Sequence, residues 1–188
     1  MPRETLDQER ILEVAGEIAD AEGLDVVTLT RIADDLGVRQ PALYRHIEGY
    51  DDLIRSLGLR GRELLAEALV RAAAGRSGEE AVTAVGNAWR DAAKQNPGMY
   101  AATDRSPCAD DPELEAAVER IVETLGLALN SFDLSEENRV HAARSMRSAF
   151  HGFVHLELGD GHPHKQELDD SFDHLLELLA AGIRALET

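Results

Sequence analysis

The segment from Val38 to Ile47, VRQPALYRHI, places hydrogen-bonding side chains of several kinds close together. An arginine followed by a glutamine can pair with the edges of guanine and adenine, because each side chain offers two groups in a fixed geometry. Tyr44, Arg45 and His46 follow, and their donors suit phosphate oxygens. The segment therefore indicates a surface that contacts DNA.

The charge of the whole chain opposes this interpretation, but its distribution does not. The 188 residues include 19 Lys and Arg against 36 Asp and Glu, a formal net charge of −17. Such a balance is unfavourable, because affinity for DNA comes largely from cations that meet phosphates. The stretch from Thr28 to Arg62, however, holds six of the basic and five of the acidic residues. The acidity thus lies almost wholly outside it.

The seven histidines raise a second hypothesis, a metal centre. His151 and His155 are four residues apart on one expected helix face, and the histidines near them are His162, His164 and His174. A metal site needs about three converging ligands, and the single cysteine, Cys108, rules out a thiolate cage and an intrachain disulfide. We interpret the histidines as interface or pocket residues and predict no metal and no cofactor. A metal-dependent sensor remains an alternative.

An enzymatic function has no support in the sequence. With 36 acidic residues, pairs of carboxylates at any spacing are expected by chance. The chain contains no G-x-S-x-G motif, no phosphate-binding glycine loop and no dinucleotide fingerprint. No apolar run approaches the roughly 18 to 20 residues that cross a bilayer. We therefore expect a cytoplasmic protein that is not an enzyme and has no membrane partner.

The spacing of apolar residues predicts an all-α fold. Ala, Leu, Glu and Arg dominate, β-branched runs are short, and Gly and Pro recur between the periodic stretches. Thr28 is the expected N-cap of the second helix and Gly37 its end, and Pro41 suits the first turn of the third. Helices are expected at about 6–22, 29–36, from 40, from 51 past 69, 79–95, 99–103, 112–130, 135–158 and 166–186.

The two short helices on either side of Gly37 fit a helix-turn-helix unit. Leu43 and Ile47 are one turn apart and are expected to face inward, which leaves Arg39 and Gln40 exposed at the start of the second helix. In such units this helix lies in the major groove. A single recognition helix contacts too few bases for specificity, so we expect a dimer on a palindromic operator.

The stretch VTLTRIADDLGVRQPALYRHIEGYDDLI resembles the DNA-binding domain of the tetracycline-repressor (TetR) family of bacterial transcriptional regulators. The glycine-valine turn and the L-Y-x-H helix carry this resemblance together. Further on, FHGFVHLELGDG and DDSFDHLLELLAAGI look like the last two helices of a ligand-binding domain common in that family. The resemblance implies about nine helices, with a three-helix DNA-binding domain at 1–50 and a helical effector-binding and dimerisation domain at 51–188.

The resemblance, together with the residue types, assigns the DNA contacts. The predicted DNA-binding residues are Thr28, Thr30, Arg39, Gln40, Pro41, Ala42, Tyr44, Arg45, His46 and Tyr50. Arg39 and Gln40 match base-reading positions, and the proline and alanine after them match positions beside thymine methyls or the sugar edge. The others match capping or phosphate-contacting positions or offer donors to phosphates, although Thr30 and Arg45 could face solvent instead.

Tyr50 departs from the family pattern. Many members have a lysine at the start of this helix, where the present chain has a tyrosine followed by Asp51 and Asp52. A tyrosine can still donate a hydrogen bond to a phosphate but brings no charge. We therefore expect non-specific DNA binding that is weaker and less dependent on salt.

The second half of the chain is expected to form a ligand cavity and a dimer interface. Long helices that enclose an apolar space with a few polar groups are usual small-molecule sites. The candidate ligand-binding residues are Trp89, Met99, Tyr100, Arg147, Phe150, His151 and Phe153, although each could equally be ordinary core. The last two helices would pair with those of a second copy. Interface candidates, some of which must line the protomer's own core, are Met146, Phe150, Phe172, Leu175, Leu179 and Ile183.

Together these features predict a dimeric bacterial transcriptional regulator. We expect a repressor that binds double-stranded DNA at a palindromic operator. A small-molecule effector that prefers another conformation would then release it. Besides the metal-dependent sensor, a DNA-binding activator or architectural protein without a ligand switch remains an alternative.

Overall fold

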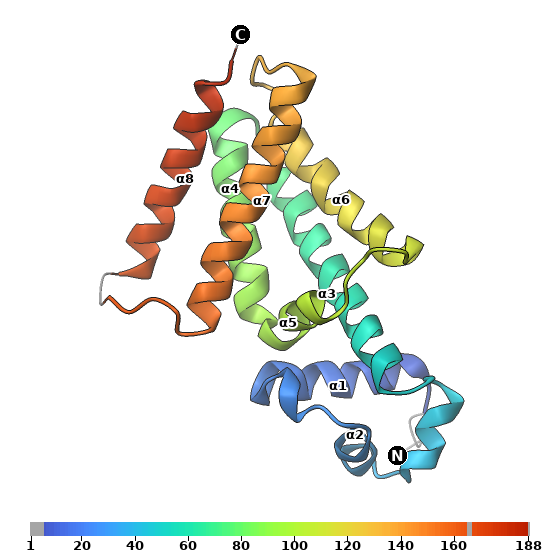
Figure 1. Cartoon of the computed structure of the whole chain (residues 1–188). Coiled ribbons are helices and arrows are strands. Elements are labelled where there is room, and N and C mark those ends of the chain that lie inside the picture. Colours follow the sequence, from blue (N-terminus) through green and yellow to red (C-terminus); the bar gives the residue numbers. More distant parts are fainter. Residues whose placement is uncertain (1–5, 165–166, 188) are drawn as a thin grey trace. The chain divides into compact units, whose positions relative to one another are not determined.

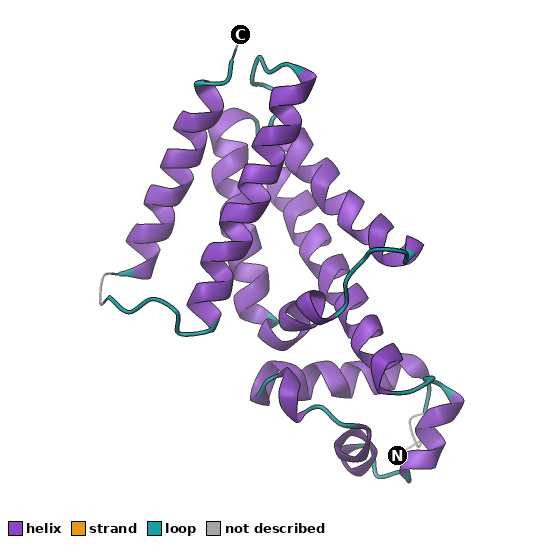
Figure 2. Cartoon of the chain, viewed as in Figure 1, coloured by secondary structure: helices purple, strands orange, loops and turns teal. Residues whose placement is uncertain are grey.

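The computed structural model describes residues 6–164 and 167–187, and within these ranges the chain forms helices joined by turns and loops, without a strand (Figure 2). This confirms the predicted all-α fold class. Packing divides the chain into two units. Unit 1 is the chain up to Glu63 together with Gln95–Glu115, and unit 2 is Leu64–Lys94 together with the chain from Ala116 onward. The segment 95–115 thus packs with the N-terminal helices, whereas a single boundary after residue 50 was expected.

The helices follow the predicted order, and Figure 1 colours them along the chain. Two short 3-10 helices, labelled η, occur among the α-helices of the first half. Unit 1 contains α1 (Gln8–Glu22), η1 (Leu24–Val26), α2 (Leu29–Asp35), η2 (Gln40–Arg45), the start of α3 (Tyr50–Ala73) and α5 (Pro97–Arg105). Unit 2 contains the rest of α3, α4 (Gly78–Gln95), most of α6 (Pro112–Ala128), α7 (Glu136–Leu158) and α8 (Leu168–Arg184).

Side-chain caps explain where three of the helices begin. The carboxylate of Asp7 accepts a hydrogen bond from the Arg10 amide at 2.9 Å, and the Thr28 hydroxyl accepts one from the Arg31 amide at 3.2 Å. The Ser135 hydroxyl does the same at the start of α7. Each cap satisfies an amide that has no partner inside the helix. The predicted N-cap role of Thr28 is confirmed.

The third helix differs from the prediction, because η2 is a 3-10 helix of six residues. Its turns are closed by short-range bonds from the Ala42 amide to the Arg39 carbonyl and from the His46 amide to the Leu43 carbonyl. Pro41 lacks an amide hydrogen and suits this first turn. With so few residues, η2 depends on tertiary packing for its stability.

The core of unit 1 supplies that packing. Leu43 and Ile47 are 0% and 2% exposed, which confirms that they face inward. They belong to one apolar cluster with residues of α1, α2 and α3, including the fully buried Ile11, Ile32 and Leu53. Burying a side chain of this size contributes roughly 1.5 to 3 kcal/mol. The cluster therefore holds η2 against the rest of the unit.

Helix α5 is bound at both ends by charged side chains of other unit 1 helices. The Asp20 carboxylate of α1 accepts hydrogen bonds from the amides of Gly98 and Met99 at 2.8 and 3.0 Å. Burial raises the pKa of Asp20, although these two bonds act in the opposite direction. At the other end, the buried Arg62 of α3 donates to the carbonyls of Thr103 and Ser106 at 2.8 and 2.7 Å. An anion at the N-terminus and a cation at the C-terminus complement the helix dipole.

Glycines allow the backbone of α5 to approach its neighbours. A Cβ added to Gly98 would lie 2.1 Å from the Ala19 carbonyl carbon of α1, and one added to Gly61 of α3 would lie 2.5 Å from the Met99 oxygen. Gly58, one turn earlier on α3, faces Ser106 in the same way. Because the obstructing atoms at Gly98 and Gly61 include backbone, side chains there could not simply move aside. The glycines therefore set how closely α1, α3 and α5 pack.

Unit 2 packs α4, α7 and α8 around aromatic side chains. The ring of the fully buried Phe150 lies 6.0 Å from that of Trp89 and 6.4 Å from that of Phe172, measured between centroids. Gly86 of α4 lets Phe150 and Leu176 approach its backbone. These aromatic contacts join α4, α7 and α8.

A buried ion pair lies at one end of this core. Arg90 of α4 donates two hydrogen bonds to the Glu157 carboxylate of α7, at 2.6 and 2.7 Å, and a third contact joins it to Asp169 of α8 at 2.7 Å. The Arg90 guanidinium also lies 5.0 Å from the centre of the Phe172 ring. Hydrogen bonding to Arg90 lowers the pKa of Glu157. The pair therefore stabilises unit 2 above the usual carboxyl pKa of 4.5, and the contribution is lost as the pH falls below it.

Replacing Gly98 with alanine is expected to destabilise the protein by about 1 to 3 kcal/mol, since the new methyl group would meet the α1 backbone. The measurement is the free energy of unfolding from a urea titration followed by circular dichroism. Gly126→Ala is the matched control, because a Cβ at that position of α6 meets nothing within 4 Å. It should raise stability by up to about 1 kcal/mol. Equal effects of the two substitutions would contradict the close approach of α1 and α5.

Candidate nucleic-acid interface

The helix-turn-helix unit consists of α2, a tight turn and η2. Gly37 occupies the turn with a φ of 65°, a left-handed conformation that favours glycine. The amide of Val38 donates to the Ala33 carbonyl at 2.9 Å, which returns the chain against the end of α2. The direct contact between α2 and η2 follows from this turn. Within η2, Leu43 is the buried residue, and the helix lies at the surface of unit 1.

The predicted DNA-binding residues gather on this surface. Arg39, which precedes η2, is exposed, and the Tyr44 side chain within η2 is 53% exposed. Gln40 and His46 are half-buried beside them. The exposed members of the predicted set are Thr28, Thr30, Arg39, Pro41, Tyr44 and Arg45. These side chains thus lie at the surface of a single small helical unit.

A chain of hydrogen bonds links three of these side chains. The Thr30 hydroxyl donates to Gln40 Oε1 at 3.3 Å, and Gln40 Nε2 donates to the Tyr44 hydroxyl at 3.3 Å. Thr30 belongs to α2, whereas the other two belong to η2. The amide of Gln40 is therefore held between both helices of the helix-turn-helix unit.

Arg31, which lies next to Thr30, has a structural role. Its guanidinium donates to Glu22 at the end of α1 at 2.7 Å and to Asp35 one turn ahead at 3.2 Å. These carboxylates, Glu22 first, raise the pKa of the Arg31 guanidinium. Arg31 joins α2 to the end of α1, a role that sequence reasoning did not predict.

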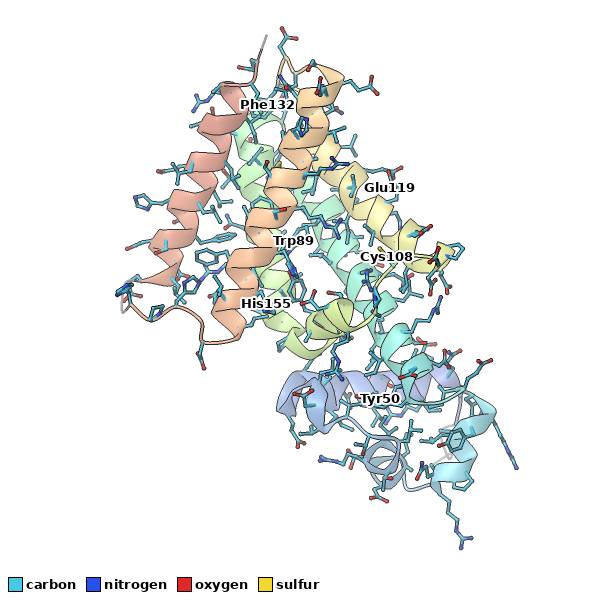
Figure 3. The ribbon with its side chains drawn as sticks, viewed as in Figure 1. Tyr50, Trp89, Cys108, Glu119, Phe132 and His155 are labelled. Atoms are coloured by element: carbon cyan, nitrogen blue, oxygen red, sulfur yellow. The ribbon has the colours of Figure 1, made fainter. Side chains whose placement is uncertain are left out.

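Tyr50 is the first residue of α3 and is half-buried against the unit 1 core (Figure 3). It lines a cavity of about 590 Å³ together with acidic side chains that include Asp51 and Asp52. Asp52 already accepts a hydrogen bond from the Glu48 amide at 2.9 Å. The start of α3 therefore carries negative charge where a family lysine would carry positive charge.

The same cavity contains a partly exposed ion pair. Arg55 donates to Asp111 at 2.8 Å through one nitrogen and forms a second bond to it through another, and it also reaches Glu113. Hydrogen bonding to Arg55 lowers the pKa of Asp111 to about 2. Arg55 is thus engaged by two carboxylates and ties α3 to the segment before α6.

The structure distributes the predicted ligand-binding residues over both units. Met99 and Tyr100 lie on α5 of unit 1, where Met99 packs against Gly16 of α1 and Tyr100 is buried. The other candidates belong to unit 2, where Trp89 and Phe150 lie in the aromatic core. Arg147 is exposed, and His151 and Phe153 are half-buried. Arg90 and Glu157, the charged groups within that core, were missed, because nothing in the sequence marks a buried ion pair.

The predicted dimer residues also divide into two groups. Met146, Phe150, Phe172 and Ile183 are at most 3% exposed and pack inside unit 2, so they leave no surface for a second copy. Some of the interface candidates were expected to line the protomer's own core, and these four residues do so. Leu175 and Leu179 of α8 are half-buried, and Leu178 between them is 71% exposed. Leu178 was missed because it lies off the apolar stripe that identifies the core face.

Two of the histidines lie close together on α7. The rings of His151 and His155 lie 5.9 Å apart on α7, and the ring of His162 packs 5.1 Å from that of Phe153. His174 of α8 is exposed, and its Nδ1 lies 2.7 Å from the Asp170 carbonyl, which raises its pKa. The metal-dependent sensor therefore stays an alternative.

Among the described residues, each helix is too short or too polar to cross a membrane.

Comparisons with known proteins agree with this geometry. The family model for the tetracyclin repressor-like C-terminal domain matches residues 82–179. An uncharacterised HTH-type (helix-turn-helix) transcriptional regulator of Mycobacterium tuberculosis is 35% identical over 184 residues, 97% of this chain and 84% of the relative. Another, from Bacillus subtilis, is 30% identical over 183 residues, 97% of this chain and 95% of the relative.

Solved structures share the fold. A TetR variant from Acinetobacter baumannii, in complex with minocycline, superimposes with a TM-score of 0.72 at 22% identity and covers 98% of this chain and 99% of that chain. A helix-turn-helix unit joined to a helical C-terminal region defines a class of transcriptional regulators. The chain belongs to the TetR family within this class.

Replacing Tyr50 with lysine is expected to strengthen DNA binding at low salt. An added cation near the phosphates would release one more counterion, so the slope of log affinity against log salt should steepen by about one per protomer. The measurement is fluorescence anisotropy with a random-sequence duplex across a salt series. Tyr50→Phe, which keeps the ring and adds no charge, should leave the slope unchanged. A slope unaffected by the lysine would place residue 50 away from the phosphates.

Proposed function

We propose that this regulator is a repressor that binds a palindromic DNA operator through the surface formed by Thr28, Thr30 and residues 39–46. The observation that carries the proposal is the arrangement of η2. Leu43 is fully buried, while Arg39 and Tyr44 are exposed on either side of the half-buried Gln40. Arginine and glutamine at the start of such a helix suit the donor and acceptor pattern of the major groove. Tyrosine, arginine and histidine further along suit phosphates.

The distribution of charge supports a specific rather than a general affinity for DNA. The stretch from Thr28 to Arg62 has nearly balanced charge, while the remainder accounts for the net charge of −17. Arg31 and Arg55 within that stretch are already paired with carboxylates. Few cations therefore remain to attract DNA of any sequence, and affinity must come from contacts that depend on the bases.

We infer that the active form is a homodimer. Two recognition helices related by a two-fold axis would meet successive major grooves roughly 34 to 36 Å apart. The exposed Leu178 and its half-buried neighbours Leu175 and Leu179 give α8 an apolar strip outside the unit 2 core. A two-fold interface repeats the same strip on both copies. We propose that α8, together with α7, forms this interface.

Release of the operator by a small molecule is proposed from the family relationship. The related TetR variant from Acinetobacter baumannii was solved in complex with minocycline. In the present chain α3 contributes residues to both units, so a conformational change in unit 2 could reach the DNA-binding unit along this helix. An effector would lower DNA affinity by its differential affinity for the two conformations.

Replacing Leu178 with glutamate is expected to weaken self-association at least tenfold, because it would bring two like charges into an apolar two-fold contact. Sedimentation velocity over a concentration series measures this. Leu127→Glu is the matched control, since that side chain is 61% exposed on α6. A dimer that persists unchanged in Leu178→Glu would place the interface elsewhere.

The DNA-binding proposal is tested with Arg39→Ala/Gln40→Ala. Duplexes selected by the wild type from a random pool should bind this variant at least a hundredfold more weakly at moderate salt, since each lost base pairing costs about 1 to 3 kcal/mol. Electrophoretic mobility shift measures the affinity. Arg71→Ala, which removes an arginine that is 70% exposed in unit 2, is the control and should bind like the wild type. Equal binding by the double variant and the wild type would refute the proposed surface.

A further inference from the structure

The side chain of Gln40 lies between two hydroxyl groups that fix both ends of its amide. The Thr30 hydroxyl donates to Gln40 Oε1, and Gln40 Nε2 donates to the Tyr44 hydroxyl, each at 3.3 Å. Tyr44 lies one turn further along η2, but Thr30 comes from α2. The bond from Thr30 is thus the one that links the Gln40 amide to the other helix of the unit.

These two bonds leave a defined pattern on the amide. A glutamine oxygen can accept two hydrogen bonds, and its nitrogen carries two hydrogens. With one of each used inside the protein, one acceptor position and one donor hydrogen remain. A neighbouring acceptor and donor complement the adenine edge in the major groove, which presents a donor at N6 and an acceptor at N7.

The direction of the Thr30 bond also decides what Thr30 itself can do. A hydroxyl has a single hydrogen, and that of Thr30 is directed to Gln40 Oε1. Thr30 therefore cannot donate to a phosphate while it holds Gln40. The Tyr44 hydroxyl only accepts the hydrogen bond from Gln40, so its own hydrogen remains for a phosphate. The two residues, both predicted as phosphate contacts, are thus distinguished by their hydrogen bonds.

The two hydrogen bonds restrict the Gln40 side chain before DNA binds. A free glutamine side chain loses rotational freedom when it docks against a base. Bonds that restrict it beforehand reduce that loss, and they also favour one of the two orientations related by exchange of oxygen and nitrogen. A base that needs the opposite orientation must break both bonds.

We propose that Thr30 is a specificity-determining residue that positions the Gln40 amide for adenine, and that it is not a phosphate contact. This inference rests on the proposed function, in which Gln40 reads a base. The base preference at the Gln40 position then depends on the Thr30 hydroxyl, which α2 supplies.

The test is selection of binding sites by the full chain from a pool of random-sequence duplexes. Gln40→Ala identifies the base pair that Gln40 reads, because the preference there is lost. Thr30→Val should lower the adenine preference at that same base pair by about tenfold, the loss of one well-placed pairing. Thr30→Ser keeps the hydroxyl and should restore it. Thr83→Val, an exposed threonine of α4, is the matched control and should leave all preferences unchanged.

Several outcomes overturn the inference. If Thr30→Val weakens binding equally for selected and altered sites, Thr30 contacts a phosphate. If it changes nothing, or shifts the preference at a different base pair from Gln40→Ala, Thr30 does not position Gln40. If the wild type enriches no sequence, the proposed DNA-binding function itself is wrong. If the wild type enriches a motif and Thr30→Val enriches the same motif, only the role of Thr30 is wrong.

Discussion

The burial of Leu43 and Ile47 is the contact on which the proposed DNA-reading surface depends. An isolated 3-10 helix of six residues has too few hydrogen bonds to offset the entropy of ordering its backbone. These two side chains anchor it in a core shared with α1, α2 and α3. Because they point inward, Arg39, Gln40 and Tyr44 are directed to other faces of the helix. The geometry of recognition is therefore set by apolar packing, while the polar residues supply only its chemistry.

The same unit includes a helix that is distant in sequence. Asp20 binds the amides at one end of α5 and Arg62 the carbonyls at the other, and glycines bring the backbones of α1 and α3 close to it. Unit 1 is consequently joined to unit 2 by the chain at three places, after residues 63, 94 and 115. Each of these crossings lies within a helix, the first in α3, the second in α4 and the third in α6.

Local signals explain why much of unit 1 could be predicted. Thr28, Gly37 and Pro41 act through their own backbone geometry, so their effects are visible in the sequence. The inward positions of Leu43 and Ile47 follow from helical periodicity in the same way. The residues that were missed act across long distances in the chain. Neither the cap that Asp20 gives to α5, nor the Arg90–Glu157 pair, has a pattern at fixed spacing.

Burial also explains the limits of the predictions for unit 2. Apolar periodicity identifies the face of a helix that is buried, but it does not say whether the partner is the same chain or another copy. The periodicity of α7 and α8 thus identified buried positions, and the structure places three of them, Met146, Phe172 and Ile183, in the protomer core. Met99 and Tyr100 belong to unit 1 because α5 packs on α1. No local sequence pattern predicts this contact.

The central claim, that residues 28–46 of unit 1 read DNA, is tested most directly by amide chemical-shift mapping. Isotope-labelled protein would be titrated with a duplex selected from a random pool and with an unselected duplex of equal length. The account predicts that the selected duplex shifts the amides of the α2 start, η2 and the α3 start most strongly, and the unselected one only weakly. Shifts confined to unit 2, or equal for both duplexes, would contradict it.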